Sequence, residues 1–155
     1  MVTVTNLAAQ GGGVSFNAGN VVTQFAGVVS GNASFIFVGA NAAAALTVGF
    51  VDGVNGITTA NGQVTILNPG AGGLLTVSNA INTGNADVSL TADAMAINAA
   101  INAGTQNTVK LFTILPGRNI DLGTKSTCNL GLTDTELDRV SAGTLSIGTP
   151  SPGNI

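Results

Sequence analysis

Short hydrophobic triplets recur along the whole chain, each with an apolar residue, a small or polar residue and a second apolar residue. Alternation with a period of two is typical of a β-strand with one buried face. Glycine, asparagine and aspartate lie between the triplets, where a turning chain often needs positive φ values. The pattern therefore predicts short strands at Val14–Phe16, Phe35–Phe37, Leu46–Val48, Val64–Ile66, Leu75–Val77, Val88–Leu90, Met95–Ile97, Val109–Leu111, Ile120–Leu122, Leu130–Leu132 and Leu145–Ile147.

Segments of the chain resemble one another at intervals of 20 to 24 residues. Residues 74–84 (LLTVSNAINTG) match residues 94–104 (AMAINAAINAG), and residues 57–67 (ITTANGQVTIL) match residues 81–91 (INTGNADVSLT). From alternate triplets we expect position 75 to stack on 95, 88 on 109, 109 on 130 and 120 on 145. Two or more short strands per 20–25 residues describe one coil of a β-solenoid, in which each strand pairs in parallel with its counterpart one coil away.

An antiparallel sandwich also consists of short strands at regular spacing. Internal similarity favours the solenoid, because the strands of a sandwich need not resemble one another. We therefore predict an all-β fold, a parallel β-helix (β-solenoid) that forms a single domain over residues 1–155. We expect this domain to be a segment of a longer repeat array.

Charged residues make up only 7% of the chain, with four Lys and Arg, seven Asp and Glu, and no His. So few cations cannot displace many phosphate counterions, which argues against nucleic acid as a partner. The lack of His excludes His-based catalytic triads and His metal sites. In a parallel ladder, repeated charges would stack at a spacing of ~5 Å and repel, so the low charge is consistent with the predicted fold.

Two further features bear on location and reactivity. Residues 35–51 are apolar, but Gly39, Asn41 and Gly49 interrupt them and the run falls just short of the usual length of a transmembrane helix, so we expect no membrane span. Cys128 is the single cysteine and cannot form an internal disulfide. We predict that it is a small buried apolar residue.

Glycine and aspartate provide the remaining candidates for chemistry. The glycine-rich residues 11–13 and 70–73 lack the GxxxxGK[ST] pattern of a phosphate loop, and the chain has no GGxGxDxUx calcium nonapeptide. Asp87 and Asp93 flank a predicted strand, without a cation nearby in the sequence. We interpret them, like Asp52, as turn residues that hydrogen-bond their own backbone.

The densest charge lies in six consecutive positions that include Asp134, Glu136, Asp138 and Arg139. In an EF-hand calcium loop, Arg139 would stand where glycine is required and Leu145 where glutamate is required, so that interpretation fails. Thr133 and Glu136 instead match the S/T-x-x-E capping box, which predicts a short helical corner near residues 133–142. The residues therefore indicate no catalytic, cofactor-binding or metal-binding site.

Residues 117–148 (GRNIDLGTKSTCNLGLTDTELDRVSAGTLSIG) resemble a recurring segment of large bacterial secreted adhesins. These proteins, of the filamentous-haemagglutinin-like and autotransporter-like class, repeat phrases of the form G-R-x-I-D-L-G and L-T-D-x-E-L-D-x-[IV]-x-A-G-T-L-x-I-G. The matching positions are Gly117, Arg118, Ile120 to Gly123, Leu132 to Asp134, Glu136 to Asp138 and Ala142 to Leu145. Residues 51–66 and 98–104 resemble the same proteins more loosely.

The resemblance implies a right-handed parallel β-helix that serves as a stalk or fibre and folds outside the cell, and it implies no catalytic residues. We therefore expect a non-enzymatic structural module of an extracellular bacterial adhesin, without cofactor, at the cell surface. Expected partners are neighbouring solenoid repeats or like subunits end to end, with host or surface glycans and proteins as further candidates. The alternatives are a self-assembling extracellular filament or sheath subunit, and a β-helix enzyme that acts on carbohydrate through Asp87, Asp93 and Asp121.

Overall fold

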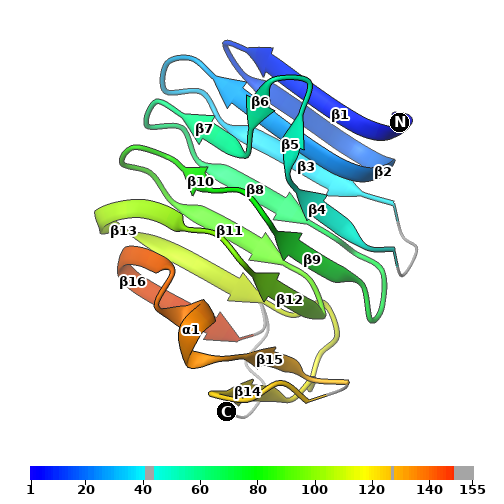
Figure 1. The fold of residues 1–155 in the computed structure, drawn as a ribbon, viewed down its shortest axis with the longest axis vertical. Helices are drawn as coiled ribbons and strands as arrows, with labels where there is room; N and C mark the ends of the chain where they lie inside the picture. Colours follow the sequence, from blue (N-terminus) through cyan, green and yellow to red (C-terminus); the bar gives the residue numbers. More distant parts are fainter. Residues whose placement is uncertain (41–43, 127, 149–155) are drawn as a thin grey trace.

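The computed structural model describes residues 1–40, 44–126 and 128–148 (Figure 1). Strands make up 59% of the chain and helix 3%, which confirms the predicted all-β class. All eleven predicted triplets lie in strands. The elements are β1 (Thr3–Gly11), β2 (Val14–Val29), β3 (Phe35–Gly39), β4 (Leu46–Val48), β5 (Phe50–Val51), β6 (Val54–Asn55), β7 (Ile57–Thr59), β8 (Val64–Leu67), β9 (Leu74–Val77), β10 (Ile81–Asn82), β11 (Val88–Thr91), β12 (Ala94–Ile97), β13 (Ile101–Phe112), β14 (Ile120–Leu122), β15 (Leu130–Leu132), α1 (Asp134–Leu137) and β16 (Val140–Gly148).

Twelve of these strands form one large sheet in which every pairing is parallel. The predicted parallel pairing is therefore present, and the antiparallel sandwich is excluded. Antiparallel pairing occurs between β5 and β6, which form a separate hairpin. Its turn at Asp52 and Gly53 has positive φ values of 48° and 80°, as a two-residue hairpin turn requires. Asp52 therefore lies in a turn, which confirms that part of its prediction.

The pairings fall into three ladders. Ladder 1 contains the start of β2, then β3, β8, β11, the end of β13 and the end of β16. Ladder 2 contains the start of β1, the middle of β2, β4, β9 and β12. Ladder 3 contains the end of β1, the end of β2, β7, β10, the start of β13 and the start of β16. From β3 to β13 the chain visits ladders 1, 2 and 3 in that order and then returns to ladder 1.

The register confirms both internal repeats. Leu75 pairs with Met95, an offset of 20, and Ile57 pairs with Ile81, an offset of 24. The expected stacking of residue 88 on residue 109 is also present. Two other expected pairs are wrong: Val109 pairs with Leu145, and Ile120 pairs with Leu130. The regular spacing therefore ends after β13, because residues 113–139 form an insertion that carries β14, β15 and α1.

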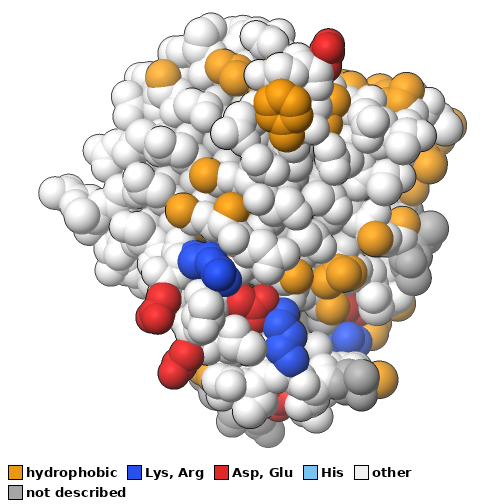
Figure 2. Space-filling view, in the orientation of Figure 1, with side chains coloured by type: hydrophobic (Ala, Val, Ile, Leu, Met, Phe, Trp, Pro, Cys, Tyr) orange, Lys and Arg blue, Asp and Glu red, His pale blue; other side chains and the backbone are white. Residues whose placement is uncertain are grey.

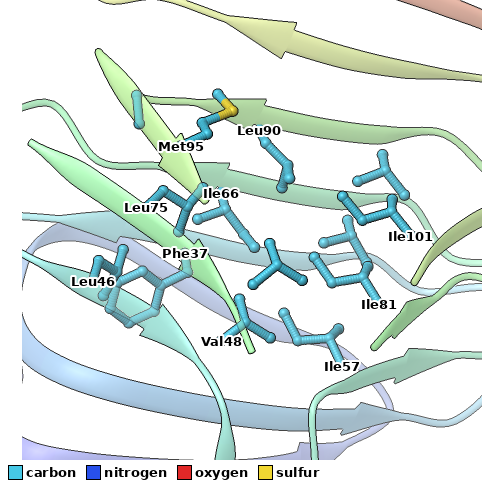
Figure 3. Packing of buried hydrophobic residues seen from close by; sticks show 14 of the residues in the cluster. Phe37, Leu46, Val48, Ile57, Ile66, Leu75, Ile81, Leu90, Met95 and Ile101 are labelled. Carbon is cyan, nitrogen blue, oxygen red and sulfur yellow. The ribbon is translucent and has the colours of Figure 1, made fainter. Parts of the chain in front are cut away.

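The core lies between the ladders and consists of inward-facing apolar residues, from most of the predicted triplets and from further positions of the strands (Figure 3). Residues that pair in register stack into columns of similar side chains, such as Ile57, Ile81 and Ile101 on ladder 3. These three side chains are fully buried. Removing a side chain of this size from water stabilises the fold by about 1.5–3 kcal/mol, so each column contributes to the stability of the sheet.

Aromatic side chains fill the N-terminal part of this core. The rings of Phe25 and Phe37 stack with centroids 4.4 Å apart, and Phe25 and Phe35 lie 6.0 Å apart. Gly27 stands in the column that holds Ile57 in the next strand. A Cβ atom at Gly27 would lie 2.2 Å from Cε2 of Phe35, so the missing side chain makes room for the ring.

The helical corner is shorter than predicted. α1 covers Asp134–Leu137, and β16 begins at Val140, whereas the sequence predicted helix to about residue 142. The capping box is confirmed: the Thr133 side chain accepts from the Glu136 amide, and the Glu136 side chain accepts from the Thr133 amide. The β-branched residue Val140 extends ladder 3 above Ile101 instead of continuing the helix.

The apolar run at residues 35–51 contributes β3, β4 and β5, and residues 41–43 lie outside the described part of the chain. No helix within the described ranges is long and apolar enough to cross a membrane.

Candidate functional site

Charged side chains gather at the C-terminal end of the sheet. All four cations and five of the seven acids lie between residues 93 and 139. Figure 2 shows them in the lower part of the view, where Figure 1 places α1, β14 and β15, with one further acidic side chain near the top. This charged end is the best candidate for a functional site, and its geometry indicates what the charges do.

The charges surround the last strand of ladder 2, β12. On one side β12 pairs with β9, where the amides of Ala94 and Asn98 donate to the carbonyl oxygens of Gly73 and Val77. On the other side β15 packs close to β12 but forms no ladder with it. The backbone groups on this side of β12 are met instead by side chains.

Three charged side chains make these bonds. The Ile97 amide donates to Oε1 of Glu136 at 3.0 Å, and Nη1 of Arg139 donates to the Ile97 carbonyl at 2.8 Å. Nζ of Lys125 donates to the Met95 carbonyl at 2.6 Å. We call Lys125, Glu136 and Arg139 the edge triad. They satisfy backbone groups that would otherwise be buried or available to another strand.

Glu136 is the centre of the edge triad. Its Oε1 also lies 2.7 Å from Nζ of Lys125, and its Oε2 accepts from the amide and the hydroxyl of Thr133 at 2.9 and 3.0 Å. The residue is 5% exposed. Burial would raise the pKa of the carboxyl, but the hydrogen bonds from Lys125, Thr133 and Ile97 outweigh that effect and lower the pKa. Glu136 is therefore ionised at neutral pH, and both of its carboxylate oxygens accept hydrogen bonds.

Asp93 forms a second buried carboxylate at this end, between β11 and β12. Its Oδ1 accepts from the amides of Ile114 and Leu115 at 2.9 and 3.0 Å, and its Oδ2 accepts from the Gly72 amide at 3.0 Å. Nη1 of Arg118 lies 3.7 Å from Oδ2. The carboxylate thus joins the turn at residues 70–73 to the turn at residues 113–118.

The prediction that Asp93 bonds its own local backbone is therefore wrong. The residue is completely buried, and the amides that it accepts from lie 21 and 22 residues away in the sequence. Burial alone would raise the pKa of its carboxyl, but the amide hydrogen bonds and the positive charge of Arg118 lower it. The glycine-rich turn at 70–73 is a corner, as predicted, and its amide at Gly72 binds this internal carboxylate.

The three aspartates proposed for carbohydrate chemistry have separate partners. Asp87 accepts from the Thr108 amide at 2.8 Å, again across 21 residues, so the prediction of a local bond is wrong here also. Asp121, on β14, accepts from the Asn129 side chain at 2.8 Å. Hydrogen bonds from Asn129 and Ser126 lower the pKa of the Asp121 carboxyl. Among the residues that the structure describes, no group of three or more His, Cys, Asp or Glu side chains could hold a metal ion.

Cys128 is exposed and has a positive φ of 70°, which contradicts the prediction that it is buried. It lies in the loop between β14 and β15, where the triplet pattern gives no guide to which side chains point inward. A groove of about 340 Å³ lies beside this loop, between Lys125, Ser126 and Asn129 on one side and Leu74, Ala94 and Ala96 on the other. The groove marks the place where β15 does not complete ladder 2.

Comparison of the chain with protein-family models, with curated proteins and with solved structures gave no match. Function must therefore be inferred from the structure and from the sequence itself.

Sequence reasoning identified Glu136 as a capping residue but missed its bond to Ile97 and its contact with Lys125. It also missed the pairing of Asp93 with Arg118, which are 25 residues apart. No local pattern connects either carboxylate to its distant partners.

Proposed function

We propose that this chain is a non-enzymatic structural module of an extracellular bacterial adhesin, a right-handed β-solenoid that forms part of a stalk or fibre. The observation that carries the proposal is the repeated passage of the chain through ladders 1, 2 and 3, with the internal repeats in register. A coil that adds one strand to each ladder per turn extends in one direction without changing its cross-section. Such a module suits a spacer.

The charged end of the sheet supports a structural role. Both oxygens of Glu136 and both oxygens of Asp93 accept hydrogen bonds from the chain's own groups. Lys125 and Arg139 donate to carbonyl oxygens of β12. A general acid, general base or nucleophile needs a group that faces substrate. These side chains face their own backbone, so they hold the fold together.

The resemblance of residues 117–148 to secreted adhesins supports the extracellular location. Two residues of the matching positions, Arg118 and Glu136, make the tertiary contacts described above. Replacing Glu136 would leave the Ile97 amide without its acceptor.

An antibody raised against the chain tests this proposal on cells that produce the protein. We expect the antibody to label intact cells and to detect a polypeptide much larger than 15.1 kDa, the mass of the chain. Labelling only after lysis would exclude the extracellular location. A band at 15.1 kDa on surface-exposed protein would exclude a stalk segment and favour the alternative, an assembling filament or sheath subunit.

A further inference from the structure

The corner between ladder 2 and ladder 3 carries an insertion in one coil. From β9 to β10 this corner consists of residues 78–80, and from β12 to β13 it consists of residues 98–100. From β4 to β7 it consists of residues 49–56, which contain the β5–β6 hairpin. The hairpin packs against β2 (Figure 1). In repeat proteins, insertions of this kind project from one face, which is often the binding face.

The base of the hairpin is held in place by hydrogen bonds. The Gly49 amide donates to the Phe25 carbonyl at 2.9 Å, and the Gly56 amide donates to the Gly49 carbonyl at 2.9 Å. The Gln24 side chain crosses the base, where its Nε2 donates to the Phe50 carbonyl at 2.8 Å. A Cβ atom at Gly49 would lie 2.6 Å from Cδ of Gln24, so the glycine makes room for this amide. These bonds fix the hairpin to the coil that contains β2 and β4.

The two faces of the hairpin differ. Val51 and Val54 form one face and are buried against Ala26, in a small cluster separate from the main core. Phe50 and Asn55 pair across the hairpin and form the other face. The Phe50 side chain is 59% exposed and belongs to neither hydrophobic cluster. Core packing therefore does not account for an aromatic residue at this position.

Side-chain amides flank the exposed ring. Asn55 lies directly opposite Phe50 on the same face, and Nδ2 of Asn79, from the next coil, donates to Oδ1 of Asn55. This bond leaves a donor, Nδ2 of Asn55, and an acceptor, Oδ1 of Asn79, at two exposed residues. Asp52, in the hairpin turn, is the only charged side chain among residues 1–86. The surface around Phe50 therefore combines an apolar ring with neutral hydrogen-bonding groups.

We propose that Phe50, Asn55 and Asn79, which we call the hairpin site, bind a neutral sugar ring of a glycan. One face of a pyranose ring presents C–H groups with partial positive charge, which are attracted to the negative face of an aromatic ring. The hydroxyl groups of the sugar both donate and accept, as the free ends of the two amides do. A sialylated or sulfated sugar would need a cation, and the four cations of the chain belong to the charged end. The inference rests on the proposed function, because it gives the adhesin module a ligand.

Nuclear magnetic resonance titration of the isotope-labelled chain tests the inference. The probes are four neutral hexasaccharides, namely maltohexaose, cellohexaose, mannohexaose and galactohexaose, and one charged probe, a heparin hexasaccharide. We expect at least one neutral probe to shift the backbone amide signals of Phe50 and Asn55 and the side-chain amide signal of Asn79. Because one ring and two amides contact little of the sugar, the expected Kd is about 1 mM.

Three variants and a matched control locate the binding. Phe50→Ala should weaken it by about tenfold or more, because the platform for the sugar is lost, whereas Phe50→Trp enlarges the platform and should strengthen it. Asn55→Asp keeps the oxygen that Asn79 bonds but removes the free donor, so it should weaken binding by about threefold to tenfold. Leu122→Ala is the control, because Leu122 is also 59% exposed but lies on β14 at the charged end, and it should leave the Kd unchanged.

Three results would overturn the inference. These are the absence of shifts at the hairpin site with all four neutral probes, binding that persists unchanged in Phe50→Ala, and tighter binding of the heparin hexasaccharide than of any neutral probe. The antibody experiment reports location and size and does not depend on sugar binding. Labelled intact cells together with a chain that binds none of the neutral probes would remove this inference and leave the proposed function in place.

Discussion

The backbone hydrogen bonds of the strands are made differently in the regular coils and at the charged end. From β3 to β13, neighbouring strands bond each other, the strand core is apolar and few charges occur. From residue 113 to residue 139 the spacing is lost, and Lys125, Glu136 and Arg139 bond β12 in place of a strand. In this protein, charged side chains are therefore concentrated where the repeat is interrupted. A dense charged cluster in a low-charge repeat protein is therefore weak evidence for an active site.

The largest expected effect is in the regular coils. Phe37→Ala removes a fully buried ring that stacks on Phe25 at 4.4 Å, and we expect it to lower the free energy of unfolding by about 3–5 kcal/mol. Denaturant titration measures the loss. Phe50→Ala is the control, because Phe50 is 59% exposed, and it should change the stability by less than about 0.5 kcal/mol. Equal losses in the two variants would mean that the aromatic core does not stabilise these coils.

The next largest effect is expected in the edge triad. Glu136→Ala leaves the Ile97 and Thr133 amides without their acceptor and Lys125 without its partner. We expect a loss of about 2–4 kcal/mol, measured by the same titration, because buried groups left unpaired are costly. Asp134→Ala in the same helix turn is the control, since Asp134 is exposed, and should cost about 0.3–1 kcal/mol. If Glu136→Ala proved no worse than Asp134→Ala, the edge triad would not be holding β12.

A smaller loss is expected for Asp93→Asn. The substitution keeps an oxygen that can accept from Ile114 and Leu115, but it places an NH2 group where Oδ2 accepts from Gly72 and faces Arg118. We expect a loss of about 1–3 kcal/mol. Asp87→Asn is the matched control, because a single oxygen of Asp87 accepts from the Thr108 amide and the amide side chain retains one. Similar melting temperatures for the two variants would contradict the role of Asp93 in joining the two turns.

The smallest effect is expected from pH. Folding lowers the pKa of both Asp93 and Glu136 from their ordinary values of 3.8 and 4.5, so the unfolded chain binds protons more readily than the folded chain. Stability should be constant at neutral pH and fall as the pH drops below about 5 towards the folded-state pKa values. Between about pH 5 and the folded-state pKa values, only part of the stabilisation from the two ionised carboxylates is lost. Melting temperatures across it should change less in Asp93→Asn than in the wild type, and a wild-type melting temperature that rises on acidification would contradict the ionised state of both groups.

Eleven strands were predictable because the two apolar residues of a triplet lie on the same face of a strand, although Leu122 and Leu145 are exposed. An apolar residue at both ends of a triplet needs only the two-residue period of a strand to reach the core, as Val88 and Leu90 do. Two of the four stacking pairs were predictable for the same reason, since residues of one column resemble each other. The pairs that involve residues 113–139 were not, because an insertion between Val109 and Leu145 carries triplets of its own and leaves the column unchanged.

The candidate site was predictable only in its local part. The capping box of Thr133 and Glu136 spans three residues, so spacing reveals it. The bond from Ile97 to Glu136 spans 39 residues, and that from Gly72 to Asp93 spans 21. A carboxylate in a turn has the same appearance in the sequence whether it bonds its neighbours or a distant loop.

By itself, the sequence determined the all-β class, the positions of eleven of the sixteen described strands, the parallel pairing and the helix start at Thr133. These follow from local periodicity and from the need of similar side chains to stack. Tertiary structure alone decided which strand follows which at the charged end, which backbone groups receive side chains instead of strands, and that Cys128 is exposed while Asp93 is buried. Those outcomes depend on which distant groups meet at the edge of β12, and the residue pattern of one segment carries no information about the unpaired groups of another.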